Sequence, residues 1–295
     1  MFVKYTALKT TISNSKASVT INHKGAELTS LQNTDTHKEY IWDGNPQYWG
    51  KHSPILFPVV GTLKDNSYTY NNRIYSLSRH GFARDMDFDL ISSYSEMSHA
   101  EAVFSLRKNN ETAKIYPFDF ELRISYILNN SELHVAYKVI NNGSNVMYYS
   151  IGGHPALALP KKFEMYSLKF EANEKLISHQ LENDLLSDKT KEIALSNNQL
   201  PLSYSLFEND ALIFKKIKSK QITILENNVP ILNFKYNGFP NFGIWTKNNA
   251  PFICLEPWAG YSDVLNYSGN LENKEGIQKL HHNAFNEYRF SIEIL

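Results

Sequence analysis

The sequence lacks several features that define large classes of proteins. It has a single cysteine, Cys254, so no internal disulfide can form, and this scarcity is typical of a reducing compartment. Its 30 Lys and Arg residues balance its 30 Asp and Glu residues, and a chain without net charge has no field that recruits nucleic acid. The longest apolar run, 55–61, is far too short to cross a bilayer.

The sequence also lacks targeting and cofactor motifs. Residues 1–11 contain lysines and threonines without an apolar core, so we predict no secretory signal and expect a cytoplasmic protein without membrane partners. No Gly-x-Gly-x-x-Gly run opens a helix and there is no P-loop, so no nucleotide cofactor is indicated. There is also no His-x-His or His-Glu-x-x-His spacing, which favours a site without a metal.

Aromatic residues are abundant, with 18 Tyr, 17 Phe and 4 Trp. Such side chains favour pleated, half-buried surfaces, and their flat faces also suit sugar rings. Strict alternation of apolar and polar residues over 120–128 and 133–139 predicts two antiparallel strands, joined by a turn at Asn129 and Asn130. Cys254 lies between apolar neighbours, so we interpret it as a buried strand residue rather than a nucleophile.

The same alternation of apolar and polar residues recurs along the whole chain, and the sequence contains no linker and no internal repeat. We therefore predict one all-β domain over 1–295, either a large sandwich or a closed barrel. Short helices are expected at 47–49 and at 180–185, and the more polar stretch 178–203 is interpreted as a surface excursion.

A strand-like run ends in Gly152 and Gly153, and His154 follows directly, with a proline behind it. Glycine admits a close approach of backbone and ligand, and Pro155 biases His154 towards an extended conformation. A histidine held on a stiff turn at a strand end suits a reacting group. The alternative is a turn whose histidine merely packs, and this stretch alone does not decide between them.

A second histidine, His80, lies between Arg79 and Arg84 in Arg-His-Gly-Phe-Ala-Arg. Two guanidiniums offer forked donors for sugar hydroxyls or for an anionic group. They also depress the imidazole pKa, which favours a neutral, hydrogen-bonding ring. The alternative is a surface loop with ion pairs to Asp85 and Asp87.

The third stretch ends an apolar strand in Glu256, followed by a proline and Trp258. A glutamate beside an indole is partly desolvated, which raises its pKa and suits a proton acceptor, while Trp258 offers a stacking face for a sugar. One acid–base pair with an auxiliary histidine is what proton-transfer chemistry requires. His80, His154 and Glu256 could also bind zinc, but they lie far apart in the sequence.

These stretches, in this order, are similar to the aldose 1-epimerase (galactose mutarotase-like) family, and within it to the LacX-like branch. The matching segments are 53–61, 79–84, 152–155 and 255–258, and the intervening strands extend the resemblance over nearly the whole chain. The resemblance implies a single-domain β-supersandwich of large antiparallel sheets. It also implies cofactor-free interconversion of the α and β anomers of a free hexose, by a monomer or homodimer.

The resemblance assigns roles to individual residues. Glu256 would take the proton from the C1 hydroxyl while His154 protonates the ring oxygen, and the pair would reverse these roles on ring closure. His80 would hydrogen-bond the ring oxygen or a neighbouring hydroxyl, and Arg84 and Arg79 would hold further hydroxyls. Asp210 is similar to the family's substrate-binding aspartate; alternatively, it caps a strand as a turn residue.

The chain departs from the family pattern at one sugar-binding arginine, where it has Thr62. The Arg-Gly-Gly of the hexose-6-phosphate branch is also missing, because residues 50–52 read Gly-Lys-His. Lys51 or Arg73 is a candidate substitute. Two alternatives to a free-hexose mutarotase therefore stay open: a hexose-phosphate mutarotase, and a sugar-binding protein of the same fold without useful turnover.

Overall fold

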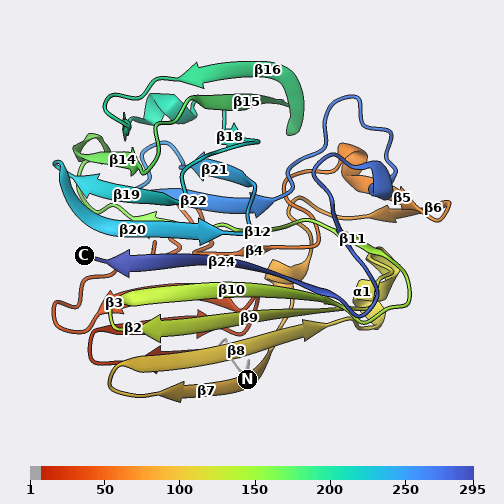
Figure 1. The fold of residues 1–295 in the computed structure, drawn as a ribbon, viewed down its shortest axis with the longest axis horizontal. Helices are drawn as coiled ribbons and strands as arrows, with labels where there is room; N and C mark the ends of the chain where they lie inside the picture. The colour runs from red at the N-terminus through yellow and green to blue at the C-terminus, as the bar shows by residue number, and fades with distance from the viewer. Residues whose placement is uncertain (1–7) are drawn as a thin grey trace, which may run out of the picture.

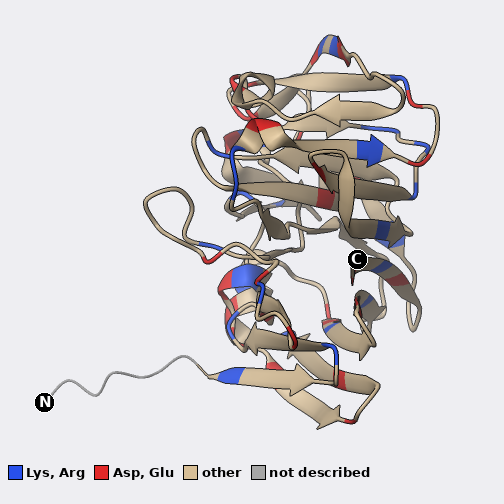
Figure 2. Cartoon of the chain, turned by 90° about the vertical axis from the view of Figure 1, so that its left-hand side faces the viewer, with Lys and Arg blue, Asp and Glu red and all other residues tan. Residues whose placement is uncertain are grey.

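The computed structural model describes residues 8–295, and this part of the chain is built almost wholly from antiparallel strands (Figure 1). The prediction that 1–11 holds no secretory signal falls mostly on 1–7, which lie outside the described residues. Within 8–295, no helix is long and apolar enough to span a membrane. Lys, Arg, Asp and Glu are interspersed over the chain, and neither sign forms a continuous block (Figure 2).

The largest sheet has nine antiparallel strands, and Figure 1 shows most of them stacked one above another. The C-terminal strand β24 lies at the centre of this sheet, so the end of the chain completes its core. In spatial order the strands are β17 (Gln199–Pro201), β14 (Tyr166–Phe170), β19 (Gln221–Glu226), β20 (Val229–Asn237), β24 (Phe285–Ile294), β10 (Glu132–Asn141), β9 (Phe120–Asn129), β8 (His99–Arg107) and β7 (Asp89–Ser95).

The second sheet has eight strands and carries the candidate site. Its longest fully buried strand, β22, pairs with β21 on one side and with the short strands β12 and β13 on the other. In spatial order the strands are β16 (Leu185–Ile193), β15 (Leu176–Glu182), β18 (Leu212–Phe214), β21 (Asn241–Trp245), β22 (Phe252–Ala259), β12 (Ile151–Gly153) and β4 (Ile55–Leu56), with β13 (Ala156–Ala158) pairing to β22.

The two large sheets share one apolar core. Phe234 of the nine-stranded sheet and Phe242 of the eight-stranded sheet meet with ring centroids 6.2 Å apart. Two open sheets packed in this way form the predicted supersandwich, so the closed-barrel alternative is wrong.

The remaining elements are β1 (Lys9–Ser13), β2 (Ala17–Asn22), β3 (Glu27–Asn33), β5 (Ser67–Tyr70), β6 (Arg73–Ser76), β11 (Met147–Tyr149), β23 (Gln278–Leu280), α1 (Asn110–Ile115) and the 3-10 turns η1 (Lys64–Asn66), η2 (Ala83–Asp85), η3 (Phe163–Met165), η4 (Tyr204–Phe207) and η5 (Leu271–Asn273).

The prediction of two strands over 120–128 and 133–139 is confirmed. β9 and β10 pair in continuous register, and alternate residues of β10 are buried. Asn130 adopts φ 50° in the turn between them, a left-handed conformation that asparagine tolerates better than most residues. Alternation of this strength specifies both the strand and the face it buries.

Three smaller predictions are wrong. Residues 47–49 form a turn rather than a helix, in which the Tyr48 and Trp49 N–H groups both donate to the Asn45 carbonyl. Residues 180–185 are the end of β15, a tight turn and the start of β16. Most of the stretch 178–203 therefore belongs to the strands β15, β16 and β17 rather than to an irregular excursion, although the β15–β16 pairing is interrupted between His179 and Leu181 and much of β16 is exposed.

Candidate active site

The floor of the site is one face of β22. Because side chains alternate across a strand, Cys254, Glu256 and Trp258 share a face while Leu255 points into the core between the sheets. All eight residues of β22 are buried, so a carboxylate on this strand leaves water on folding. Cys254 is fully buried, as expected for a strand residue.

Gly152 and Gly243 make room for an indole, whereas a Cβ on Gly153 would lie 3.0 Å from Phe290 Cε1 and from the Tyr137 hydroxyl oxygen in the core. A Cβ on Gly152 would lie 2.5 Å from Trp258 Cδ1, and a Cβ on Gly243 would lie 2.5 Å from Trp258 Cη2. Trp258 therefore lies flat across three strands and forms part of the cleft wall. The sequence analysis predicted a close approach of a ligand at these glycines, whereas the close neighbour of Gly152 is the Trp258 indole.

His154 follows β12 and is enclosed by aromatic rings. Trp49 stacks on its imidazole with centroids 4.7 Å apart at 28°, and Trp245 meets it edge-on at 5.7 Å. Neither tryptophan was predicted as a site residue. Trp49 lies in the turn that was interpreted as a helix, and Trp245 ends β21 on the same face as Cys254.

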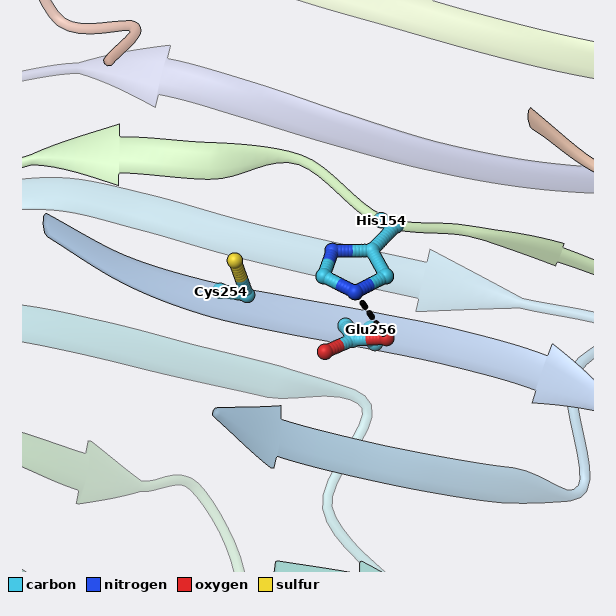
Figure 3. A group of neighbouring side chains, drawn as sticks. All are labelled: His154, Cys254 and Glu256. Atoms are coloured by element: carbon cyan, nitrogen blue, oxygen red, sulfur yellow. Dashed lines mark ion pairs between the residues drawn. The ribbon is translucent and has the colours of Figure 1, made fainter. Parts of the chain in front are cut away.

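His154 and Glu256 meet directly. Nε2 of His154 lies 3.3 Å from Oε2 of Glu256, and the two side chains are only 10% and 2% exposed (Figure 3). Burial, with smaller contributions from Arg79 and Arg84, lowers the pKa of His154 to about 3. Burial also raises the pKa of Glu256 well above its ordinary value, opposed by Arg79 and reinforced by Asp210. Both displacements favour a neutral imidazole beside a carboxyl group that keeps its proton.

Among the described residues, His154, Cys254 and Glu256 form the group whose donor atoms lie close enough to hold a metal ion, all within 4.8 Å of one another (Figure 3). The thiol is fully buried, and burial raises its pKa well above the ordinary value, with Glu256 adding to the effect. A cation here would occupy the lone pairs of His154 and Glu256. Metal binding and proton transfer by this pair therefore exclude one another.

His80 lies beside the pair, with its ring centroid 6.0 Å from that of His154. Its Nδ1 accepts the Gly61 N–H at 3.1 Å, while Arg79 Nε approaches its Nε2 at 3.2 Å. A neutral imidazole can accept at only one nitrogen. Because the backbone donor is fixed, we assign the ring proton to Nε2, where the contact with Arg79 is then not a hydrogen bond.

His80 is neutral because burial lowers its pKa well below the ordinary value, with His154, Arg79 and Arg84 adding to the effect. The direction agrees with the prediction, but burial is a larger cause than the arginines. His80 also adopts φ 69°, a left-handed conformation that costs energy for a residue with a Cβ. Next to it, a Cβ on Gly81 would lie 2.3 Å from the Phe57 carbonyl oxygen, so only glycine fits there.

The rim of the site is charged. Arg79 Nη1 contacts Asp184 Oδ1 at 2.9 Å, and its Nη2 lies 3.8 Å from Asp210 Oδ2. Asp210 lies two residues before the start of β18 and has φ 74°, and its Oδ1 accepts the Ala211 N–H at 2.7 Å. The two alternatives for Asp210 are therefore compatible, because this residue turns the chain ahead of β18 and also lines the cleft. Asp184 was not predicted.

Arg84 also lines the cleft, and its Nη2 donates to the Arg79 carbonyl at 2.8 Å. Burial lowers the pKa of Arg84. The two candidate substitutes for the missing arginine do not reach the cleft, because Lys51 pairs with Asp85 at 3.0 Å and Arg73 is exposed on β6. The further basic residue in the lining is Lys247.

These residues surround one cleft of about 820 Å³. All seven side chains proposed from the sequence line it: His154, Glu256, His80, Arg84, Arg79, Asp210 and Trp258. Aromatic and apolar side chains make up much of the remaining wall, including Tyr48, Tyr204, Phe207 and Ile213. A concave site that combines charged and polar groups with aromatic and apolar walls is suited to binding a polar small molecule.

The packed sheets and this cleft define a class of protein, the galactose mutarotase-like fold. A galactose mutarotase related enzyme from Lactobacillus acidophilus superposes with a TM-score of 0.91 and 31% identity, over 98% of this chain and 97% of that chain. A galactose mutarotase-like protein from Lactobacillus casei gives a TM-score of 0.90 and 30% identity, over 98% and 100% of the two chains.

The family follows from the sequence comparison. The aldose 1-epimerase family model matches residues 9–291, and the chain belongs to this family. The chromosomal LacX protein of Lactococcus lactis subsp. lactis is 34% identical over 284 residues, which cover 91% of this chain and 93% of that protein. The resemblance to the LacX-like branch is thus confirmed, and the family supports a mutarotase-type isomerase with a sugar-related function.

Proposed function

We propose that the protein interconverts the α and β anomers of a free hexose, with His154 and Glu256 as the acid–base pair. The observation that carries this proposal is the 3.3 Å contact between the two groups at the floor of the cleft. The C1 hydroxyl and the ring oxygen of a pyranose are bonded to the same carbon. A donor and an acceptor at adjacent positions can therefore serve both oxygens at once.

The proton count of the pair suits this chemistry. A neutral carboxyl group beside a neutral imidazole shares one titratable proton with it, bound to the carboxyl group. In a carboxylate beside an imidazolium, the same proton is bound to the imidazole ring. Burial favours the neutral arrangement in the empty cleft, whereas sugar hydroxyls that hydrogen-bond Glu256 favour the ionic one. In that form Glu256 takes the proton from the C1 hydroxyl as His154 protonates the ring oxygen. The open chain turns about C1–C2 and the reverse steps close it.

The surrounding groups would position the sugar. His80 would donate its Nε2 proton to the ring oxygen or a neighbouring hydroxyl, and Arg84 and Asp210 would bind further hydroxyls. Trp258 would offer its face to the ring. No step in this scheme requires a metal or an organic cofactor.

A free hexose fits the charges of the rim better than a hexose phosphate does. Arg79 already contacts Asp184 and lies near Asp210, and Arg84 Nε lies 3.7 Å from Asp85 Oδ2. These carboxylates compensate the positive charge that a phosphate would require. A protein that only binds sugar has no need of a desolvated acid–base pair, which favours turnover.

Polarimetry on freshly dissolved α-D-glucose and α-D-galactose tests the proposal. We expect the protein to accelerate the change in rotation beyond the buffer rate, and His154→Asn or Glu256→Gln to lower kcat at least about a hundredfold. Cys254→Ala, on the same strand face, is the matched control and should stay close to wild-type kcat. A near-wild-type kcat in either site variant would contradict the proposed mechanism. If the unmodified protein does not accelerate mutarotation, the enzymatic function is wrong and the sugar-binding alternative is favoured.

A further inference from the structure

Asp184 takes no part in the proton transfers proposed above, yet it makes the shortest ionic contact of the rim. Its Oδ1 lies 2.9 Å from Nη1 of Arg79, while Asp210 approaches the other terminal nitrogen of the same guanidinium at 3.8 Å. The three residues come from separate parts of the chain. One arginine thus faces two carboxylates, and the local charge balance is negative.

The position of Asp184 is set by a tight turn. Glu182 pairs with Leu185 across the β15–β16 hairpin, and the two intervening residues, Asn183 and Asp184, have φ 51° and 65°. Two consecutive left-handed residues are typical of a type I′ hairpin turn, in which asparagine and aspartate are favoured. The backbone of Asp184 therefore places its carboxylate at the tip of the hairpin.

The hairpin is anchored close to the floor of the cleft. The Leu186 N–H donates to the Asp263 carbonyl at 2.8 Å, and the Leu265 N–H donates to the Leu186 carbonyl at 3.1 Å. The Leu186 side chain packs in one apolar cluster with Trp258 and Ile213, which both line the cleft. Asp184 is thus a fixed negative charge rather than the end of a free loop.

This arrangement decides what Arg79 can bind. Arg79 lines the cleft, and a guanidinium there would be a natural partner for a phosphate. Asp184 occupies one side of that guanidinium and adds a charge that repels an approaching anion. We propose that Asp184 determines specificity: it positions and neutralises Arg79, so that the cleft accepts uncharged aldoses and rejects sugar phosphates. This inference rests on the proposed mutarotase function and names its substrate class.

The test uses Asp184→Asn, which removes the charge but keeps the shape and the tolerance for a positive φ. Asp188→Asn is the matched control, because Asp188 is an exposed aspartate on β16 of the same hairpin. We expect Asp184→Asn to raise KM for the free hexose about threefold, through the loss of an exposed ion pair. It should raise kcat/KM for the hexose 6-phosphate about tenfold, because a like charge is removed near the phosphate. Asp188→Asn should change neither value.

A second readout does not depend on turnover. Trp49, Trp245 and Trp258 line the cleft, so titration with inorganic phosphate can be followed by tryptophan fluorescence, with sodium chloride as the ionic-strength control. We expect Asp184→Asn to bind phosphate about tenfold more tightly than the wild type. Asp184→Glu should restore wild-type behaviour, since it returns the charge to the same rim.

The outcomes separate the two proposals. Absence of mutarotation in the unmodified protein contradicts the proposed function, while the phosphate titration still decides the role of Asp184. The inference is overturned if Asp184→Asn and Asp188→Asn bind phosphate equally and show the same preference between the two sugars. It is also overturned if the unmodified protein converts the 6-phosphate as efficiently as the free hexose.

Discussion

The floor and the rim of the cleft each contain a contact between a carboxylate and a nitrogen base, yet the two contacts differ in kind. On the floor, His154 and Glu256 are 3.3 Å apart and almost wholly buried. On the rim, Arg79 and Asp184 are 2.9 Å apart, but their side chains are 41% and 54% exposed. Similar distances therefore occur in opposite environments.

The environment decides what each contact can do. Burial displaces the pKa of Glu256 upward and that of His154 downward, which leaves a single proton that can move between them. The exposed rim pair remains in water, where an ion pair adds little to stability but can exchange partners with a ligand. The comparison fits our proposals, in which the floor transfers the proton and the rim selects the substrate.

The first prediction concerns a variant in which the floor of the cleft is less buried. Trp49→Ala removes the ring that stacks on His154 at 4.7 Å, so water reaches the imidazole and its pKa rises from about 3 towards 6.5. We expect kcat to fall about tenfold, because the displaced pKa of His154 no longer suits general acid–base catalysis. Polarimetry gives kcat, and an NMR titration of the His154 ring gives the pKa.

Trp49→Phe is the control for this change, because it keeps an aromatic ring over His154. It should retain most of the activity and most of the pKa displacement. If His154 in Trp49→Ala titrates as it does in the wild type, stacking does not maintain the environment of the floor, and the contrast between floor and rim loses its basis.

The second prediction concerns the rim. Arg84→Ala should raise KM about fivefold and lower kcat less, because a residue that holds a hydroxyl contributes equally to the ground state and the transition state. Lys51→Ala is the control, since Lys51 pairs with Asp85 without lining the cleft. An unchanged KM in Arg84→Ala would show that the sugar does not contact Arg84. Steady-state polarimetry over a range of hexose concentrations measures both constants.

The same contrast explains which parts of the fold could be predicted from the sequence. β9 and β10 have one buried face and one solvated face, so their alternation is strict and predicts them correctly. β15 and β16 form the outer edge of the eight-stranded sheet, where β16 is mostly exposed and the pairing is interrupted between His179 and Leu181. Without a buried face, alternation is lost, and the hairpin was interpreted as a surface excursion.

The site divides in the same way. His154 and Glu256 were predicted because a proline follows each of them after a strand-like run, a signal that is local in the sequence. The strand end predicted at Glu256 is wrong, because β22 continues through Pro257 and Trp258 to Ala259. Asp184 and Arg79 are 105 residues apart in the sequence, and they meet where the β15–β16 hairpin contacts the loop that follows β6. Contact between distant segments is set by the whole fold, and no local pattern encodes it.

The last prediction separates stability from activity at Glu256. Its pKa is raised in the folded protein, so the unfolded chain releases this proton at lower pH than the folded chain does. The wild type therefore loses stability as pH rises from about 4.5 through the folded-state pKa, whereas Glu256→Gln has no proton to release. The Tm of Glu256→Gln relative to the wild type should increase between pH 4 and pH 8, by about 2 °C or more.

Calorimetry across this pH range measures the difference, with the exposed substitution Glu96→Gln as the control, whose difference from the wild type should stay nearly constant. A flat difference for Glu256→Gln would show that the carboxyl group is not held neutral by the fold, and the single-proton account of the floor would fail. A difference that rises with pH and is positive at neutral pH would show that one substitution removes activity and adds stability there. Unfolding could then not explain the loss of turnover, because the inactive variant would be the more stable protein. Burial of the Glu256 carboxyl group would lower the stability of the wild type and favour the reaction.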